Sequence, residues 1–152
     1  MKKQLLLLLL LALGYISQAQ MFSNNRPVTR EERLNDEYCT GMFKTAHGTV
    51  FDFTDNINAQ GFTNILYWLQ GRVSGLNIYT SRTGVAVPVI RNQRATVYLD
   101  EMPVQLSTVD MLSVADIAMI KIIKGPFGGN MMYGSGGAVA IYTLRGEEEE
   151  ED

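Results

Sequence analysis

The sequence predicts a small α+β domain, in which two or three short helices pack against a small mixed β-sheet. The first observation behind this prediction is a change in the spacing of apolar residues. Up to about residue 75 they recur with the period of a helix, whereas beyond it they alternate with a period of two, which is typical of strands. The second observation is that each later apolar run is short and bounded by polar or turn residues. Helices followed by short strands in a chain of 152 residues are typical of a single α+β domain.

The pattern of residues 1–20 predicts a secretory signal peptide. Lys2 and Lys3 precede an apolar run, and a polar stretch of small residues from Ser17 to Gln20 resembles a cleavage region. The apolar run is shorter than the about 20 residues that a membrane-spanning helix needs. We therefore expect an exported, soluble protein without a membrane span after cleavage, located in the periplasm either free or against the outer membrane.

Residues 21–62 are expected to form a polar arm and a short helix. Thr29 and Glu32 have the spacing of a capping box, which predicts a helix that carries Leu34 and Tyr38 on its apolar side. The following stretch, up to FDFTDN, is expected to be rich in turns.

Residues 63–146 hold the remaining predicted elements and are expected to form the main domain. Thr63 is a candidate N-cap for a second helix, and Ser107 and Ser113 are candidate N-caps for one or two short helical turns. Pro88 predicts that its strand begins there or lies at an edge of the sheet. The run IAMIKIIKG is the strongest strand signal in the chain.

The charge of the chain is unevenly distributed. The net charge is −3, but two lysines belong to the signal peptide and residues 147–152 are all acidic, which leaves the folded body close to neutral. This balance predicts no nucleic-acid partner. We expect the acidic tail 147–152 to be disordered and solubilising, with partner or cation binding as the alternative.

A glycine-rich connection, from Gly125 to Gly137, joins the last two predicted strands. A phosphate-binding glycine loop opens a helix and is followed by a Lys-Ser or Lys-Thr pair, and neither feature is present here. The glycines are therefore expected to allow tight turns or close backbone approach. The apolar Met131 and Met132 and the aromatic Tyr133 within the connection either fill the domain's own core or contact a partner.

Residues suited to catalysis or metal binding are scarce. Cys39 is the only cysteine and His47 the only histidine, so a Cys-His nucleophile pair is conceivable, but no orienting partner or ligand spacing accompanies them. We predict no catalytic, cofactor-binding or metal-binding residue, and no enzymatic activity.

Several motifs together resemble the plug domain of TonB-dependent outer-membrane receptors, in particular the Bacteroidetes type. They come in the family's order between Ile65 and Gly146: LQGRVSGLNI, VIR, VYLDEMPV, ADIAMIKIIKG and MYGSGGAVAIYTLRG. The resemblance implies a small α+β domain whose Tyr-Gly-x-x-Gly loop lies between the last two strands. In the family this domain fills a barrel of about 22 strands, whereas six residues follow Gly146 here.

The expected function is therefore that of a barrel-less, plug-like interaction module, which docks with an unidentified envelope protein such as an outer-membrane receptor or barrel. Capture of a small ligand, for example an iron chelate or a glycan fragment, is the alternative. A truncated receptor without a present role and a hydrolase using Cys39 and His47 rank below these. The candidate partner-contact residues are Arg72, Arg91, Met131, Met132, Tyr133, Gly134, Gly136 and Gly137.

Overall fold

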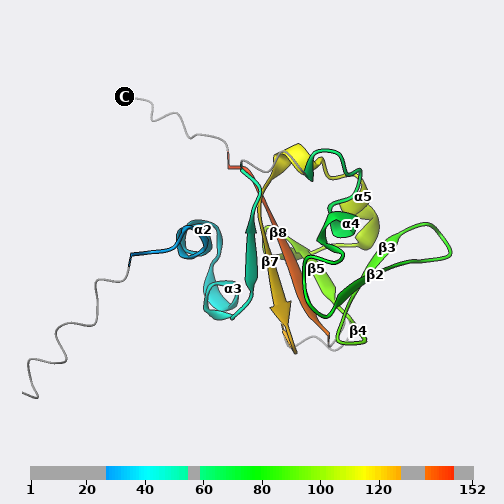
Figure 1. Ribbon diagram of the computed structural model, residues 1–152, viewed down its shortest axis with the longest axis horizontal. Helices are drawn as coiled ribbons and strands as arrows, with labels where there is room; N and C mark the ends of the chain where they lie inside the picture. Colours follow the sequence, from blue (N-terminus) through cyan, green and yellow to red (C-terminus); the bar gives the residue numbers. More distant parts are fainter. Residues whose placement is uncertain (1–26, 55–58, 128–135, 146–152) are drawn as a thin grey trace, which may run out of the picture.

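Figure 1 shows the computed structural model of the chain, which describes residues 27–54, 59–127 and 136–145. In this part of the chain, two β-sheets and several short helices build an α+β domain, so the predicted fold class is confirmed. Among the same residues, no helix combines the length and the apolar character needed to cross a membrane.

The larger sheet has five strands in the order β1-β7-β8-β5-β6. β7 is antiparallel to both of its neighbours, whereas β8 and β5 are parallel, so this sheet is mixed as predicted. Its strands are β1 (Thr49–Asp52), β5 (Thr96–Leu99), β6 (Met102–Pro103), β7 (Ile117–Lys124) and β8 (Gly137–Thr143).

β7 is the longest of the described strands and confirms the strand prediction for IAMIKIIKG. Ile120 and Ile122 point into one hydrophobic cluster, while Ile123 belongs to another on the opposite face. Because both faces of this strand are covered, its sequence is almost continuously apolar.

β1 lies within the stretch expected to be rich in turns, and this strand was not predicted. Its Val50 and Phe51 pair with β7, opposite Lys121 and Ile120. The strand has four residues, none of them fully buried, so it carries little of the alternation by which a strand is recognised in a sequence.

The smaller sheet is antiparallel in the order β2-β3-β4, with β2 at Leu76–Thr80, β3 at Ala86–Ile90 and β4 at Gln93–Arg94. Pro88 therefore lies in the central strand, and the prediction of an edge position was wrong. β4 pairs only with Val89 and Ile90, so the ladder ends at the proline. The Pro88 carbonyl still accepts a hydrogen bond from the Ala95 N–H, and no N–H is required in return.

The described helices are short: α2 (Arg30–Tyr38), α3 (Gly41–Thr45), α4 (Ile65–Leu69), α5 (Leu106–Asp110) and the 3₁₀ turn η2 (Val114–Asp116). The capping box of α2 is confirmed: the Glu32 N–H donates to Thr29 Oγ1 at 3.2 Å, and the Thr29 N–H donates to Glu32 Oε2 at 2.9 Å.

Two of the other predicted caps were wrong by one or two positions. Asn64 rather than Thr63 caps α4, because its side-chain oxygen accepts from the Leu66 N–H at 2.8 Å. Ser107 lies inside α5. Ser113 does cap η2, as predicted.

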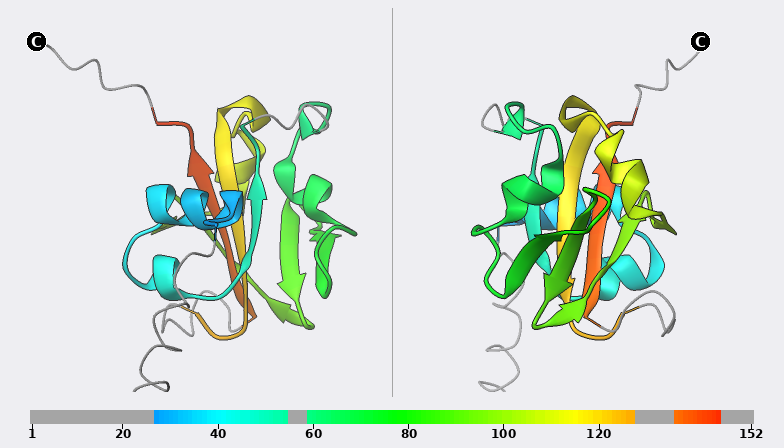
Figure 2. Two further views of the ribbon diagram at one scale, coloured as in Figure 1. Left: turned by 60° about the vertical axis from the view of Figure 1, so that its left-hand side comes forward. Right: turned by 90° about the vertical axis from the view of Figure 1, so that its right-hand side faces the viewer.

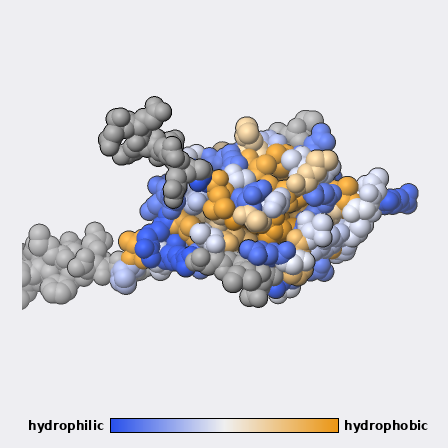
Figure 3. All heavy atoms as spheres, turned by 90° about the horizontal axis from the view of Figure 1, so that it is seen from above, coloured by the Kyte–Doolittle hydropathy of each residue, from blue (hydrophilic) through white to orange (hydrophobic). Residues whose placement is uncertain are grey.

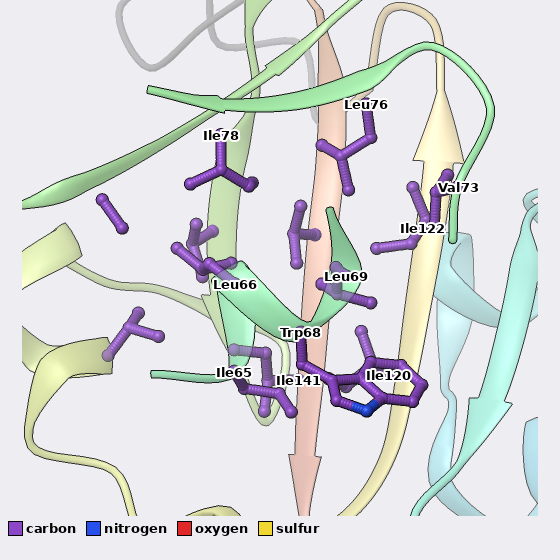
Figure 4. Close-up of a cluster of buried hydrophobic side chains, with 14 of the residues drawn as sticks. Ile65, Leu66, Trp68, Leu69, Val73, Leu76, Ile78, Ile120, Ile122 and Ile141 are labelled. Carbon is purple, nitrogen blue, oxygen red and sulfur yellow. The ribbon is translucent and has the colours of Figure 1, made fainter. Parts of the chain in front are cut away.

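The elements form three layers, which Figure 2 shows side by side: α2 and α3 on one face of the larger sheet, and the smaller sheet with α4 on the other. The main hydrophobic cluster lies between the two sheets, where Leu66 and Leu69 of α4 meet Ile78 of β2 and Ile141 of β8 (Figure 4). A second cluster packs Leu34, Tyr38, Cys39 and Phe43 of the helical layer against the opposite face of β7 and β8.

Candidate partner interface

The strand directions bring positive charges together at one end of the larger sheet. β7 ends there at Lys124, which is paired with Gly137 at the start of β8, and Arg94 lies beside them because its carbonyl accepts from the Gly136 N–H at 3.2 Å. Arg91, in the turn between β3 and β4, is at the same end. We call this surface the glycine end; its residues are Arg91, Arg94, Lys124, Gly125, Gly136 and Gly137.

The cations of the glycine end have no carboxylate partner among the described residues. Arg91 and Arg94 are exposed and Lys124 is half-buried, and none of the three forms an ion pair within this part of the chain. Arg91 also adopts a positive φ of 49°, followed by Asn92 at 69°, which is the backbone of a tight two-residue hairpin turn. Arginine is unusual at such a position because its Cβ crowds the backbone there.

The opposite end of the sheet is acidic. Asp52, Asp100, Glu101 and Asp116 lie at or beside the other ends of β1, β5 and β7. Figure 3 looks onto this end, where apolar residues are interspersed with hydrophilic ones. Even with Arg30, which pairs with Asp52, and Arg145 beyond β8 at this end, its net charge is negative and opposite in sign to that of the glycine end, although the body as a whole is nearly neutral.

Gly136 and Gly137 confirm the expectation of close backbone approach. A Cβ on Gly136 would lie 2.7 Å from the carbonyl carbon of Gln93 and 2.9 Å from Arg94 O, closer than real Cβ atoms come. Gly137 has a φ of 119°, and a Cβ there would collide with Ile123 O. The two glycines thus pack against the domain's own backbone, which anchors one end of the connection.

The remaining predicted contact residues fall into two groups. Arg72 is exposed, yet its guanidinium lies 4.3 Å from the centre of the Trp68 ring and donates to Trp68 O at 2.5 Å, so this side chain is fixed within the domain. Met131, Met132, Tyr133 and Gly134 lie outside the described residues.

A cavity of about 460 Å³ opens between the β2–β3 hairpin and the start of α5. Its floor is apolar, and Arg94, Gln105 and Ser107 stand among its polar groups. The volume falls within the range of about 300–1,000 Å³ that is typical of small-molecule sites. The other lining residues are Ser81, Thr83, Val85, Val87, Ala95, Thr96, Val97, Val104 and Leu106.

Cys39 lies in a buried polar cluster beneath α2 and α3. Burial raises the pKa of the Cys39 thiol, an effect that its hydrogen bond with Tyr142 and the nearby Lys121 charge only partly offset. A nucleophilic cysteine needs the opposite shift, because the thiolate is the reactive form. His47 is exposed and is not among the groups that influence the thiol.

Lys121 is the buried cation of this cluster, with 2% of its surface exposed. Its ammonium donates to Asn35 Oδ1 at 2.5 Å and to Phe43 O at 2.6 Å, and burial lowers its pKa. The sequence offered one signal for it, a lysine inside the most apolar strand. Within the described residues, no group of three or more histidine, cysteine or acidic side chains is placed to hold a metal ion.

Comparison with solved structures supports the fold alone, because sequence identities are low. The RagAB peptide importer in its closed-closed state matches with a TM-score of 0.52 and 20% identity, over 69% of this chain and 13% of the other. The siderophore receptor PirA from Acinetobacter baumannii gives 0.51 and 19%, over 67% and 18%. The ferric enterobactin receptor PfeA from Pseudomonas aeruginosa gives 0.51 and 19%, over 78% and 19%.

The chain thus spans less than a fifth of the length of these receptors. No curated protein matches the sequence closely enough to count as a relative. A family model, described as the TonB-dependent receptor plug domain, matches residues 53–141, which is more than half of the chain and contains both sheets apart from β1 and the end of β8. The chain therefore belongs to the TonB-dependent receptor plug domain family.

Proposed function

We propose that this plug domain is exported to the periplasm and acts there as a non-catalytic interaction module, docking its glycine end against an acidic surface of an envelope protein such as an outer-membrane receptor or barrel. The observation that carries the proposal is the set of three cations, Arg91, Arg94 and Lys124, that have no carboxylate partner among the described residues. Complementary charge across an interface accelerates association and fixes the orientation of the partners.

Two further features support a docking role for this end. Arg91 lies in the tight turn between β3 and β4, and the bond from its N–H to Gly75 O at 2.9 Å fixes the position of its backbone. Gly136 and Gly137 fix the start of β8 firmly beside Arg94, so the charged residues lie on a rigid base. A rigid base reduces the entropy lost on binding.

Site-specific photo-crosslinking in intact cells tests the proposal. Ser74 is exposed and precedes Gly75, whose carbonyl accepts from the Arg91 N–H, so a crosslinking amino acid at this position samples the glycine end. Met111 is 87% exposed and serves as the matched control elsewhere on the domain. We expect a discrete crosslinked species from position 74 only.

The charge dependence of that species provides the second part of the test. Changing Arg91, Arg94 and Lys124 together to glutamate should abolish the crosslink without lowering the thermal stability of the domain. The same species from both positions, or a crosslink that survives the charge reversal, would refute docking through the glycine end.

A second candidate function is capture of a small ligand that combines an apolar body with an anionic group. The cavity of about 460 Å³, which Arg94 helps to line, favours it. A thermal-shift screen of carboxylic acids and anionic chelates tests it, because a ligand at 100 times its Kd adds about 2.7 kcal/mol of stability. Arg94→Gln should remove the shift, and ligands that stabilise the variant equally would exclude this site.

A further inference from the structure

We propose that the free edge of β2 binds an extended segment of a partner protein as an added strand, and that this segment carries acidic residues on both sides of a neutral, strand-forming stretch. The inference rests on the proposed function only in requiring a protein partner. It concerns the edge of a strand, which adjoins the glycine end at Arg91.

Two hydrogen bonds at the ends of the β2–β3 ladder fix the direction of every backbone group in β2. The Arg91 N–H donates to Gly75 O at 2.9 Å, and the Ser81 N–H donates to Val85 O at 2.8 Å. All four of these residues have odd numbers, and both bonds fit the same antiparallel register of β2 and β3. Because hydrogen-bonded pairs alternate along an antiparallel ladder, the even-numbered residues of β2 direct their N–H and C=O groups away from β3.

The outward-directed backbone groups belong to Leu76, Ile78 and Thr80. The Leu76 N–H already donates a hydrogen bond to Val73 O at 3.1 Å. Ile78 and Thr80 have no backbone partner on this side among the described residues. Two successive donor–acceptor sets are thus available to an added strand, which is the main-chain basis of binding by β-augmentation.

The edge of β2 also lacks the protection that exposed strands usually have. It is the longest edge strand in the described part of the chain, and its five residues include no charge and no proline. Asn77 and Tyr79 are exposed on the outer face, Tyr79 by 54%. An aromatic side chain there offers an added strand a cross-strand neighbour.

Charges at the two ends of the strand indicate which partner fits. Arg82 lies two residues beyond the end of β2 and is exposed, and the Arg91 N–H donates to the carbonyl of Gly75, the residue before β2. A second copy of β2 in antiparallel pairing would bring Arg82 of each copy to the end of β2 at which Arg91 of the other copy lies, one strand further away, and these like charges repel each other. A neutral segment with acidic residues at its ends places opposite charges at both positions.

Peptide selection with matched variants tests this inference. A library of random short peptides is panned against the protein purified after export, and binding of the enriched peptides is then measured by fluorescence anisotropy. Thr80→Pro removes one outward N–H, whereas the control Thr80→Val loses the side-chain hydroxyl but keeps that N–H. We expect acid-flanked, β-branched peptides whose affinity falls about tenfold or more in Thr80→Pro and is unchanged in Thr80→Val.

A second variant keeps the test informative if the proline disturbs folding. Arg82→Glu lies outside the ladder and should weaken the same peptides by a similar factor at low salt, with a smaller effect at high salt. Failure to enrich peptides, or equal binding to all variants, would overturn the inference while leaving the crosslinking result at the glycine end unaffected. Concentration-dependent dimerisation abolished by Thr80→Pro would show instead that a second copy occupies the edge.

Discussion

Three glycine-to-alanine changes separate backbone strain from steric collision: one in the turn between β2 and β3, and two at the glycine end. Gly84 has a φ of 85°, and no atom lies within 4 Å of the place that a Cβ would take, so Gly84→Ala introduces strain alone. Gly136 has no positive φ, but a Cβ there would lie 2.7 Å from a backbone carbon, so Gly136→Ala introduces collision alone. Gly137→Ala introduces both strain and collision, because Gly137 has a φ of 119° and a Cβ there would collide with backbone atoms of Ile123 and Gly125.

The expected magnitudes follow from these geometries. Left-handed strain in Gly84→Ala should destabilise by about 1–2 kcal/mol. Overpacking in Gly136→Ala should destabilise by about 1–3 kcal/mol. Gly137→Ala should destabilise by about 2–5 kcal/mol, because strain and collision add. That is a large part of the about 5–15 kcal/mol that stabilises a typical domain.

Denaturant unfolding followed by tryptophan fluorescence measures the series. Trp68 is the only tryptophan and is 4% exposed, so its emission reports on the main hydrophobic cluster. The denaturant slope should stay constant across the series if the denatured state is unchanged. Should Gly137→Ala be no less stable than Gly84→Ala, the close packing would be refuted and the backbone of the glycine end would be free for a partner.

Three further predictions concern the polar cluster beneath α2 and α3. Glu101 accepts hydrogen bonds from Thr40 N, Thr40 Oγ1 and the Tyr142 hydroxyl, so Glu101→Ala should destabilise by about 1–3 kcal/mol in the same unfolding assay, and Glu101→Gln by less. Because the pKa of Cys39 is raised in the folded protein, the folded chain binds more protons than the unfolded one above about pH 9, and stability falls as pH rises. Cys39→Ala should therefore reduce the alkaline loss of unfolding free energy, and an unchanged dependence of that free energy on pH would contradict this. The lowered pKa of Lys121 has the opposite effect: the unfolded chain binds more protons than the folded one just below pH 10.5, so this lysine adds stability as pH rises. Lys121→Met should therefore steepen the alkaline loss of unfolding free energy, and a shallower loss would contradict the lowered pKa.

The sequence predicts those elements whose signals are local. The capping box of α2 was correct because both bonds join residues three positions apart, and β7 was correct because burial on both faces makes it continuously apolar. β1 was missed because a partly buried edge strand is specified by its pairing with β7, far along the chain. Pro88 was misplaced because its tolerance in a central strand depends on where β4 ends.

The candidate interface could be predicted only in part, for a similar reason. Arg91 was identified from the sequence, but Arg94 and Lys124 were not, since only the pairing of Lys124 with Gly137 and the bond from Gly136 to Arg94 bring them to the same end. The glycines gave a signal for close approach without revealing what they approach. The free edge of β2 has no sequence signal, because it depends on the absence of a neighbouring strand among the residues that the structure describes.

The glycine end and the edge of β2 adjoin at one hydrogen bond, from the Arg91 N–H to Gly75 O. The turn that presents Arg91 is therefore fixed to the residue before β2, and a partner strand lying along the free edge of β2 would end one strand away from Arg91 of the glycine end. A single partner able to engage both surfaces would gain affinity without any further linker, because binding at one surface raises the effective concentration at the other. The species crosslinked from position 74 should then also weaken in Thr80→Pro. If it does not, the two surfaces serve different partners.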